Sequence, residues 1–211
     1  MNLSDNDRII ERYNKRIEKY GSTIQALASG NEERRKIRFQ TLFDCGIKKG
    51  DSILDLGCGF GDFYQYLNEV LGPGNFNYTG IDINPNIIKR ARERFPEAEF
   101  RTSNILEDGL NDFFDFIVST SSFNLKLHEI DNYEFIQNLL NLCYNSSYKG
   151  VAIDFLSDYV DFKSTTDAFY YKPEVVFSNA KSITKRITLR HDYPLFEFCL
   201  YLYKDFKGWA H

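Results

Sequence analysis

The sequence has few histidines and cysteines and no long hydrophobic run. Its 211 residues include three histidines and four cysteines, and no two cysteines have the CxxC spacing of a zinc or redox site. No apolar stretch approaches the roughly 18 residues of a membrane-spanning helix, and the first residues lack the charged-then-apolar pattern of a signal peptide. We therefore expect a cytoplasmic protein with reduced thiols and without a metal site.

Positive charge is not in excess either. Lysine and arginine total 26 against 30 acidic residues, which gives a formal net charge of −4, so no overall field attracts nucleic acid. Hydrophobic residues make up 43% of the chain and aromatic residues 16%, which suits a globular protein that buries a core and shapes a pocket. We expect a monomer or homodimer that binds a small molecule, rather than nucleic acid or a membrane.

The most informative segment joins an apolar strand to a glycine-rich loop. Ser52–Leu56 has the character of a buried strand, and Gly57, Gly59 and Gly61 follow it at alternate positions. Asp82 closes the next predicted strand, 21 residues beyond the last of these glycines. This layout suits a nucleoside that lies across the carboxyl ends of two parallel strands. The Asp82 carboxylate is placed to accept hydrogen bonds from both hydroxyls of a ribose.

The spacing of the glycines decides between nucleoside cofactors. A dinucleotide fingerprint, G-x-G-x-x-G, needs a third glycine at position 62, which is Asp62 here. An anion at that helix N-terminus would repel a phosphate. The sequence Asp55-x-Gly57-x-Gly59-x-Gly61 instead resembles motif I of the class I S-adenosylmethionine-dependent methyltransferases. The cofactor of that family carries a cationic sulfonium and no phosphate.

The rest of the chain predicts alternating strands and helices, hence an α/β fold. A helix capped by Ser4 carries an apolar stripe that ends at Gly21, and a second helix is expected over Asn31–Gly46. Further helices are expected at 62–71, from Pro85 to the residue before Pro96, at 132–144 and from Pro173. Strands are expected at 52–56, 78–82, 99–102, 114–119, 151–155, 182–190 and 195–204.

A terminal hairpin after five parallel units is a second pointer to the methyltransferase family. The resemblance, over residues 50–205, implies a Rossmann-like class I methyltransferase fold. This is a mostly parallel seven-stranded sheet with an antiparallel last strand, helices on both faces and an N-terminal helical cap. We therefore expect a single methyltransferase domain over residues 1–211, with 1–46 as the cap or lid and 50–205 as the cofactor-binding core.

The resemblance also implies S-adenosylmethionine as cofactor, with S-adenosylhomocysteine as product. By position, Ile83 packs on the adenine, and Asn104 stands where the family usually has an acid near the adenine amino group. An amide oxygen can still accept that hydrogen bond. Cys58 lies inside the glycine loop, where its small size explains its presence better than a redox role does. The implied cofactor-binding residues are Asp55, Gly57, Cys58, Gly59, Gly61, Asp82, Ile83, Asn104, Ile105 and Ser119.

Candidates for the acceptor side come from loops at the carboxyl edge of the sheet. His191 is the candidate general base, because the end of the expected sixth strand points to the ligand side of the sheet; alternatively, it orders the hairpin turn through Asp192. His128 is a weaker candidate for the base. Of Asp154 and Asp158, after the fifth strand, we expect one to contact substrate and the other to be solvated. The expected acceptor-binding residues are Tyr13, Asn124, Asp158, Tyr170, Tyr171 and Tyr193. The alternative is core packing or loop ordering for Tyr170 and Tyr171, and packing within the lid for Tyr13.

These features predict an enzyme that transfers a methyl group to oxygen or nitrogen of a small molecule. The segment 119–124 lacks the Asn-Pro-Pro-Tyr type of sequence, which disfavours DNA adenine and release-factor glutamine as acceptors. The segment 189–198 is similar to bacterial methyltransferases of small metabolites and surface glycans, so a glycan or capsule precursor is one candidate acceptor. The alternative function is a non-catalytic S-adenosylmethionine-binding regulatory or partner subunit. A nicotinamide oxidoreductase is disfavoured by Asp62 and the hairpin.

Overall fold

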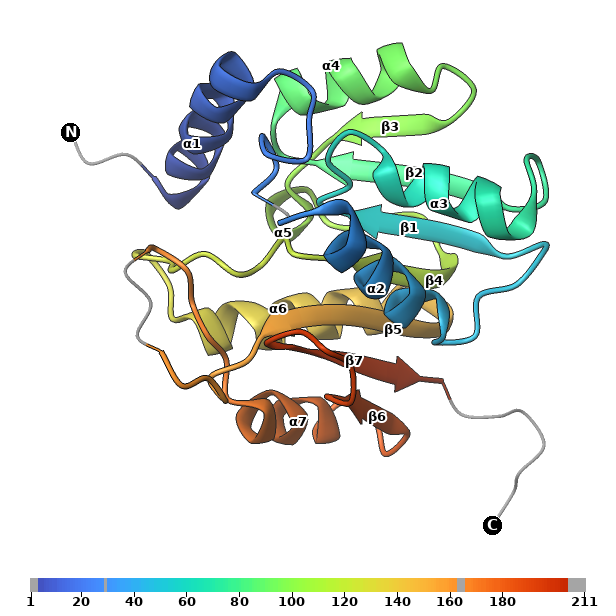
Figure 1. The fold of residues 1–211 in the computed structure, drawn as a ribbon. Coiled ribbons are helices and arrows are strands. Elements are labelled where there is room, and N and C mark those ends of the chain that lie inside the picture. Colours follow the sequence, from blue (N-terminus) through green and yellow to red (C-terminus); the bar gives the residue numbers. More distant parts are fainter. Residues whose placement is uncertain (1–3, 29, 163–165, 205–211) are drawn as a thin grey trace.

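Seven strands form one sheet at the centre of the computed structural model, which describes residues 4–28, 30–162 and 166–204 (Figure 1). The spatial order is β3-β2-β1-β4-β5-β7-β6. β7 runs antiparallel to both β5 and β6, and the other neighbouring pairs are parallel. The strands are β1 (Ser52–Leu56), β2 (Asn77–Asp82), β3 (Glu99–Thr102), β4 (Phe114–Ser119), β5 (Ser147–Leu156), β6 (Ile187–Arg190) and β7 (Glu197–Tyr203).

Helices cover both faces of this sheet. One core contains side chains of α2 (Glu32–Phe43), α3 (Asp62–Leu71) and α4 (Pro85–Arg94). The opposite core contains side chains of α5 (Ile105–Asp108), α6 (Asn132–Asn145) and α7 (Pro173–Lys181). β7 shows the alternation that a strand buried on both faces requires, because Cys199 and Tyr201 pack into the first core while Phe198 and Leu200 pack into the second. The predicted fold class is therefore confirmed.

α1 (Asp5–Tyr20) lies beyond the carboxyl ends of β1, β2 and β3 (Figure 1). Its predicted cap is present, since the Ser4 side chain accepts a hydrogen bond from the backbone N–H of Asp7. Ile17 of α1 packs with Ala26, Phe60 and Ile87 in a small third cluster. Within the described residues, no helix combines the length and apolar character that crossing a bilayer requires.

Two strands begin elsewhere than expected by several residues, and one short helix was not expected. β5 begins at Ser147 rather than Val151, because its polar first residues gain backbone pairing with β4 and β7. β6 begins at Ile187 rather than Ser182, because the residues before it form a turn in which the Ile183 and Thr184 amides bond back to Ala180. α5 was not expected, since four residues are too few to show a helical period.

Candidate active site

A cavity of about 350 Å³ lies at the carboxyl edge of the sheet. Its floor is the end of β1 with the loop after it, the end of β2, and the segment that follows β3. Its remaining walls include α1, α2, the loop between β4 and α6, and side chains of α3, α4 and α6. The cavity therefore lies where open α/β sheets bind ligands, and helices from the first 43 residues help to enclose it.

The loop after β1 reaches the cavity as bare backbone. Gly57 has φ of +70°, and its N–H donates to the carbonyl of Ile81 on the neighbouring strand at 2.7 Å. A Cβ added at Gly57 would lie 2.0 Å from Oγ of Ser122, which belongs to the loop after β4. A side chain at position 57 is thus excluded both by backbone conformation and by space.

Asp82 presents a fixed carboxylate at the end of β2. Its Oδ1 accepts the N–H of Asn84 at 2.9 Å, and its Oδ2 accepts the N–H of Gly59 at 3.4 Å. Burial raises the pKa of Asp82 to about 6 although these two hydrogen bonds act to lower it. Asp82 is thus held against the glycine loop with capacity for further hydrogen bonds on both oxygens.

Asp55 is a buried acid whose hydrogen bonding is incomplete. Only 1% of its surface is exposed, and its Oδ2 accepts the hydroxyl of Tyr78 at 2.7 Å. Within the described part of the chain, no group hydrogen-bonds to Asp55 Oδ1. Burial raises the pKa of Asp55 to about 7. A buried, unsatisfied carboxylate oxygen beside a cavity calls for a cationic or hydrogen-bond-donating ligand.

Ile83, Asn104 and Ile105 line the cavity beyond Asp82. The two isoleucines supply apolar wall. Asn104 has an additional structural role, because its Oδ1 accepts the N–H of Leu106 at 3.3 Å and caps α5. The amide oxygen expected to accept an adenine amino group is therefore already engaged in one hydrogen bond, and its second lone pair is what could serve a ligand.

Gly61 and Ser119, also expected at the cofactor, lie outside the cavity lining. A Cβ at Gly61 would come within 2.9 Å of the rings of Phe95 and Phe100, so this glycine allows α4 and β3 to approach the loop. Ser119 is fully buried, and its hydroxyl donates to the carbonyl of Leu56 at 2.7 Å. Gly61 and Ser119 therefore help to position the loop after β1 without lining the cavity themselves.

The loop after β4 contributes a polar wall through Thr120 and Ser121, which were not among the expected site residues. Thr120 and Ser121 line the cavity, and both are bonded to Asp154 at the end of β5. The Thr120 hydroxyl donates to Asp154 Oδ2 at 2.6 Å, and the Ser121 N–H donates to Asp154 Oδ1 at 2.6 Å. Burial, with the charge of Glu197 second, raises the pKa of Asp154 to about 7.

Arg38 of α2 lies on the same side of the cavity. Its Nε and Nη2 donate to the two carboxylate oxygens of Glu197 at 2.6 Å each, and both side chains are less than 10% exposed. This bidentate pair joins α2 to β7 beneath the cavity. In the sequence, Arg38 stands with Arg34, Arg35 and Lys36 in a run of basic residues. Such a run is typical of a solvated helix face, so it does not indicate that one member is buried.

Most of the residues expected to bind the acceptor do not line the cavity. Tyr13 of α1 does line it. Tyr171 lies in the second core instead, fully buried, with its hydroxyl donating to the carbonyl of Phe123 at 2.8 Å. The side-chain oxygen of Asn124 accepts the N–H of Leu156 at 2.9 Å and so orders its own loop. Asp158, Tyr170 and Tyr193 are also outside the lining.

His191 and His128 are also outside the cavity lining. His191 follows β6, the outermost strand, with β7 and β5 between it and β4. It therefore lies at the correct edge of the sheet but too far along it, with its ring 5.4 Å from that of Tyr159 and 6.0 Å from that of Phe198. The side chain of His128 is exposed, whereas its backbone N–H is engaged with α1.

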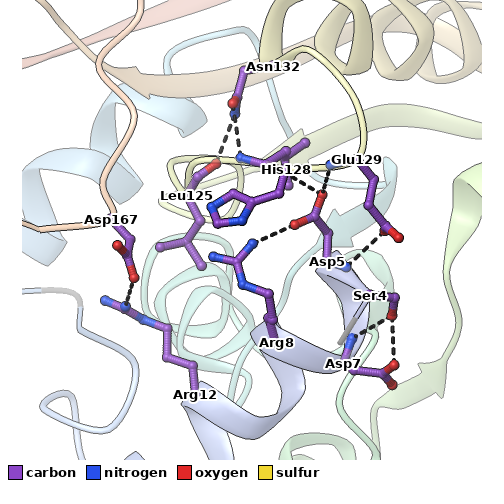
Figure 2. Close-up of polar contacts among 11 residues, drawn as sticks. Ser4, Asp5, Asp7, Arg8, Arg12, Leu125, His128, Glu129, Asn132 and Asp167 are labelled. Atoms are coloured by element: carbon purple, nitrogen blue, oxygen red, sulfur yellow. Dashed lines mark hydrogen bonds and ion pairs between the residues drawn. The ribbon is translucent and has the colours of Figure 1, made fainter. Parts of the chain in front are cut away.

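Polar contacts fasten the start of α1 to the loop between β4 and α6 (Figure 2). The carboxylate of Asp5 accepts the N–H groups of His128 and Glu129, each at 2.8 Å, and Nη1 of Arg8 at 2.6 Å. In return, the Asp5 N–H donates to the Glu129 side chain at 2.9 Å. Burial acts to raise the pKa of Asp5, but these hydrogen bonds outweigh it and lower the pKa overall. We call this set the Asp5 clasp.

A second contact fastens the middle of α1 to the N-terminus of α4. Oδ1 of Asn14 accepts hydrogen bonds from the side-chain amides of Asn84 at 3.0 Å and Asn86 at 3.1 Å. Asn84 is buried and directly follows the Asp82–Ile83 wall. α1 thus contacts two separate sides of the cavity, one beside the end of β2 and one beside the loop after β4.

Comparison with known protein families and sequences identifies methyltransferases as similar. A family model described as a methyltransferase domain matches residues 47–148. Rv1506c, a Mycobacterium tuberculosis protein assigned as a methyltransferase, is 32% identical over 157 residues, which are 72% of this chain and 93% of that protein.

Solved structures share the fold at low sequence identity. Magnesium protoporphyrin IX methyltransferase from Synechocystis PCC 6803, with S-adenosylhomocysteine bound, superposes with a TM-score of 0.67 at 14% identity, over 96% of this chain and 100% of that chain. An S-adenosylmethionine-dependent methyltransferase from Clostridium acetobutylicum superposes with a TM-score of 0.62 at 15% identity, over 90% of this chain and 97% of that chain.

Proposed function

This chain belongs to the class I S-adenosylmethionine-dependent methyltransferases, and from that premise we propose that it methylates an oxygen or nitrogen atom of a small molecule in the cavity between the sheet and α1. The observation that carries the proposal is the unsatisfied carboxylate oxygen of Asp55, next to the bare backbone of Gly57. A ligand with a positive charge at that point would satisfy it.

The residues present fit S-adenosylmethionine along the whole length of the cavity floor. Asp82 would accept the ribose hydroxyls, and Ile83 and Ile105 would flank the adenine. Asp55 would face the cationic methionine portion over the glycine loop. Asn104 would contribute the remaining lone pair of its amide oxygen to the adenine amino group. When bound, the cofactor supplies an electrophilic methyl group on a sulfonium.

The chain's own contribution is alignment and exclusion of water. An activated methyl donor needs a nucleophile held in line with the methyl group, and such positioning alone accounts for much of the barrier reduction. α1 contributes Ile9 and Tyr13 to the wall opposite the sheet. The Asp5 clasp and the Asn14 contact hold this helix in place, so we assign residues 1–46 the role of a lid.

The enclosure of the cavity favours a small acceptor. Helices α1 and α2 line the cavity and narrow the space beside the sheet, and the cofactor would occupy a large part of the volume of about 350 Å³. Thr120 and Ser121 give the acceptor wall a polar character. A hydroxyl-rich surface-glycan or capsule precursor therefore belongs among the acceptors to be tested.

Titration calorimetry with S-adenosylmethionine and S-adenosylhomocysteine tests cofactor binding. Asp82→Ala should weaken binding at least about tenfold, because a hydrogen-bonded charged group contributes roughly 1.5–3 kcal/mol. Asp112→Ala, an exposed acid paired with Arg101, is the matched control and should bind normally. Equal affinity of both variants would refute the ribose assignment.

Transfer itself is tested with trideuteromethyl-labelled S-adenosylmethionine. The protein is incubated with the small-molecule fraction of a bacterial extract, and mass spectrometry identifies metabolites that gain the label. Cofactor binding without any labelled product would favour the alternative of a non-catalytic regulatory or partner subunit. Absence of binding by both cofactor forms would refute both functions.

A further inference from the structure

We propose that Thr120 and Asp154 form the proton-accepting pair on the acceptor side of the cavity, and that the acceptor therefore presents an O–H or N–H group to Thr120. This inference rests on the proposed function, because it concerns the acceptor of the same methyl transfer. Thr120 would touch the acceptor. Asp154 is not itself in the cavity lining and would act through the threonine hydroxyl.

The Thr120 hydroxyl donates its hydrogen bond to Asp154, which leaves its oxygen free to accept one. A threonine hydroxyl has one proton and two lone pairs. The Thr120 proton is committed to Oδ2 of Asp154 at 2.6 Å, so the hydroxyl oxygen can offer the cavity a lone pair. A lone pair binds a hydrogen-bond donor. Hydroxyl and amine acceptors carry such a donor on the atom to be methylated, whereas a thioether or an ionised carboxylate does not.

The strand order places this pair on the side opposite the nucleoside. Asp82 follows β2, the glycine loop follows β1, and Thr120 follows β4, which flanks β1 on its other side. With the nucleoside at Asp82 and the methionine portion over the glycine loop, the next space along the sheet edge is the one that Thr120 faces. Ser121, held at φ of +57° by its N–H bond to Asp154, fixes the same loop.

The surroundings of Asp154 suit a group that takes up a proton. Its side chain is 3% exposed, and burial outweighs its two hydrogen bonds to raise its pKa. The charged and titratable groups that face it are Glu197 and Cys199 of β7, Arg38 of α2, and Tyr193 of the preceding turn. Glu197 raises the pKa of Asp154 and Arg38 lowers it. A carboxylate whose pKa lies near the working pH is an efficient general base.

The proposed methyl transfer needs no reactant other than the methyl donor, the acceptor and these two side chains. A lone pair of the acceptor oxygen or nitrogen forms the bond to the methyl carbon, and the electron pair of the broken S–CH₃ bond remains on sulfur. The proton of the acceptor passes to the Thr120 oxygen while the Thr120 proton passes to Asp154. Asp154 later returns a proton to water through the same hydroxyl.

Three variants separate this role from a structural one. Thr120→Val keeps the shape and removes the hydroxyl, Thr120→Ser restores it, and Asp154→Asn removes the base. Thr188→Val, at an exposed position on β6, is the matched control. S-adenosylhomocysteine affinity should stay within about twofold in all four, whereas Thr120→Val and Asp154→Asn should lower kcat by about 10²–10³, in the range of general-base effects. Thr120→Ser should retain most of the activity.

Two further readouts do not depend on the rate at a single pH. Infrared difference spectra of the protein with S-adenosylhomocysteine should show a carboxyl group that titrates near neutral pH and is lost in Asp154→Asn. The pH profile of kcat should rise through that pKa in the wild type and flatten in Asp154→Asn. The labelled methyl group should be found on oxygen of a hydroxyl or on nitrogen.

Several results would overturn the inference while leaving the proposed function intact. These are full activity of Thr120→Val, an Asp154 that stays ionised throughout the titration, and a label confined to the oxygen of a carboxylate. Absence of any labelled product, or a label confined to sulfur or carbon, would instead refute the proposed function, and this inference would fall with it.

Discussion

The unsatisfied Asp55 carboxylate makes cofactor affinity depend on pH. In the protein alone the pKa of Asp55 is raised to about 7 by burial. A cation against Oδ1 favours the ionised form, so binding S-adenosylmethionine below that pH must release the proton. Each pH unit below the pKa then costs about 1.4 kcal/mol, or a factor of about ten in affinity. Between about pH 7 and pH 5, we expect roughly a hundredfold loss of affinity.

Calorimetry at a series of pH values measures this dependence directly. Repeating each titration in buffers of different ionisation enthalpy gives the number of protons released, which should approach one at about pH 6. Asp55→Asn should bind weakly at every pH and lose the slope between about pH 7 and pH 6. Asp82, with a pKa of about 6, contributes a second dependence below that range, which Asp55→Asn should keep. A wild-type affinity that is flat between about pH 7 and pH 6, or a slope there that survives in Asp55→Asn, would refute the assignment of Asp55 to the cationic part of the ligand.

The same residue predicts an opposite effect on stability without ligand. A folded-state pKa above the ordinary value of 3.8 means that the folded protein holds a proton that the unfolded chain has lost. The stability associated with Asp55 is therefore full at low pH and declines as pH rises through about 7. Asp55→Asn should stabilise the ligand-free protein above that pH, by as much as about 4 kcal/mol, which thermal melts at high and low pH would detect.

Three further changes test the geometry around the cavity. Gly57→Ala should abolish measurable cofactor binding in calorimetry, because the new Cβ would lie 2.0 Å from Ser122 Oγ at a φ of +70°; normal binding would show that the loop relaxes freely. Asp5→Ala should weaken the docking of α1 by about 2 kcal/mol and speed hydrogen exchange in that helix, whereas Asp7→Ala, on the exposed side of the same turn, should not. His191→Ala should leave kcat within about twofold, since the ring is outside the cavity, and a large loss of kcat at unchanged melting temperature would restore it as the base.

The fold could be predicted closely because the residues that begin and end its helices and strands act on their immediate neighbours in the sequence. The glycine loop bounds β1, Asn84 with Pro85 starts α4, and these signals depend on neighbouring residues alone. The cofactor side shares this property, since Asp55 and Asp82 belong to adjacent strands, Gly57 directly follows the first of them, and their spacing in the sequence is characteristic.

The acceptor side could not be predicted in the same way. Thr120 and Asp154 are 34 residues apart, and their contact depends on β4 pairing with β5. His191 looked suitable because it follows a strand that ends at the correct edge. Only the strand order shows that two other strands separate it from β4. Residues that meet through sheet order leave no periodic or spacing signal in one sequence.

The polar contacts that hold α1 on two sides of the cavity have a consequence for how ligands enter and leave. The Asp5 clasp holds the helix near the loop after β4, and Asn14 holds it near the end of β2. The Ile17 cluster and the Arg12–Asp167 ion pair hold the same helix as well. An acceptor near Thr120 and a nucleoside near Asp82 would therefore lie next to different contacts of one helix. Loss of the Asp5 clasp would loosen α1 beside the acceptor, whereas loss of the Asn14 contact would loosen it beside the nucleoside.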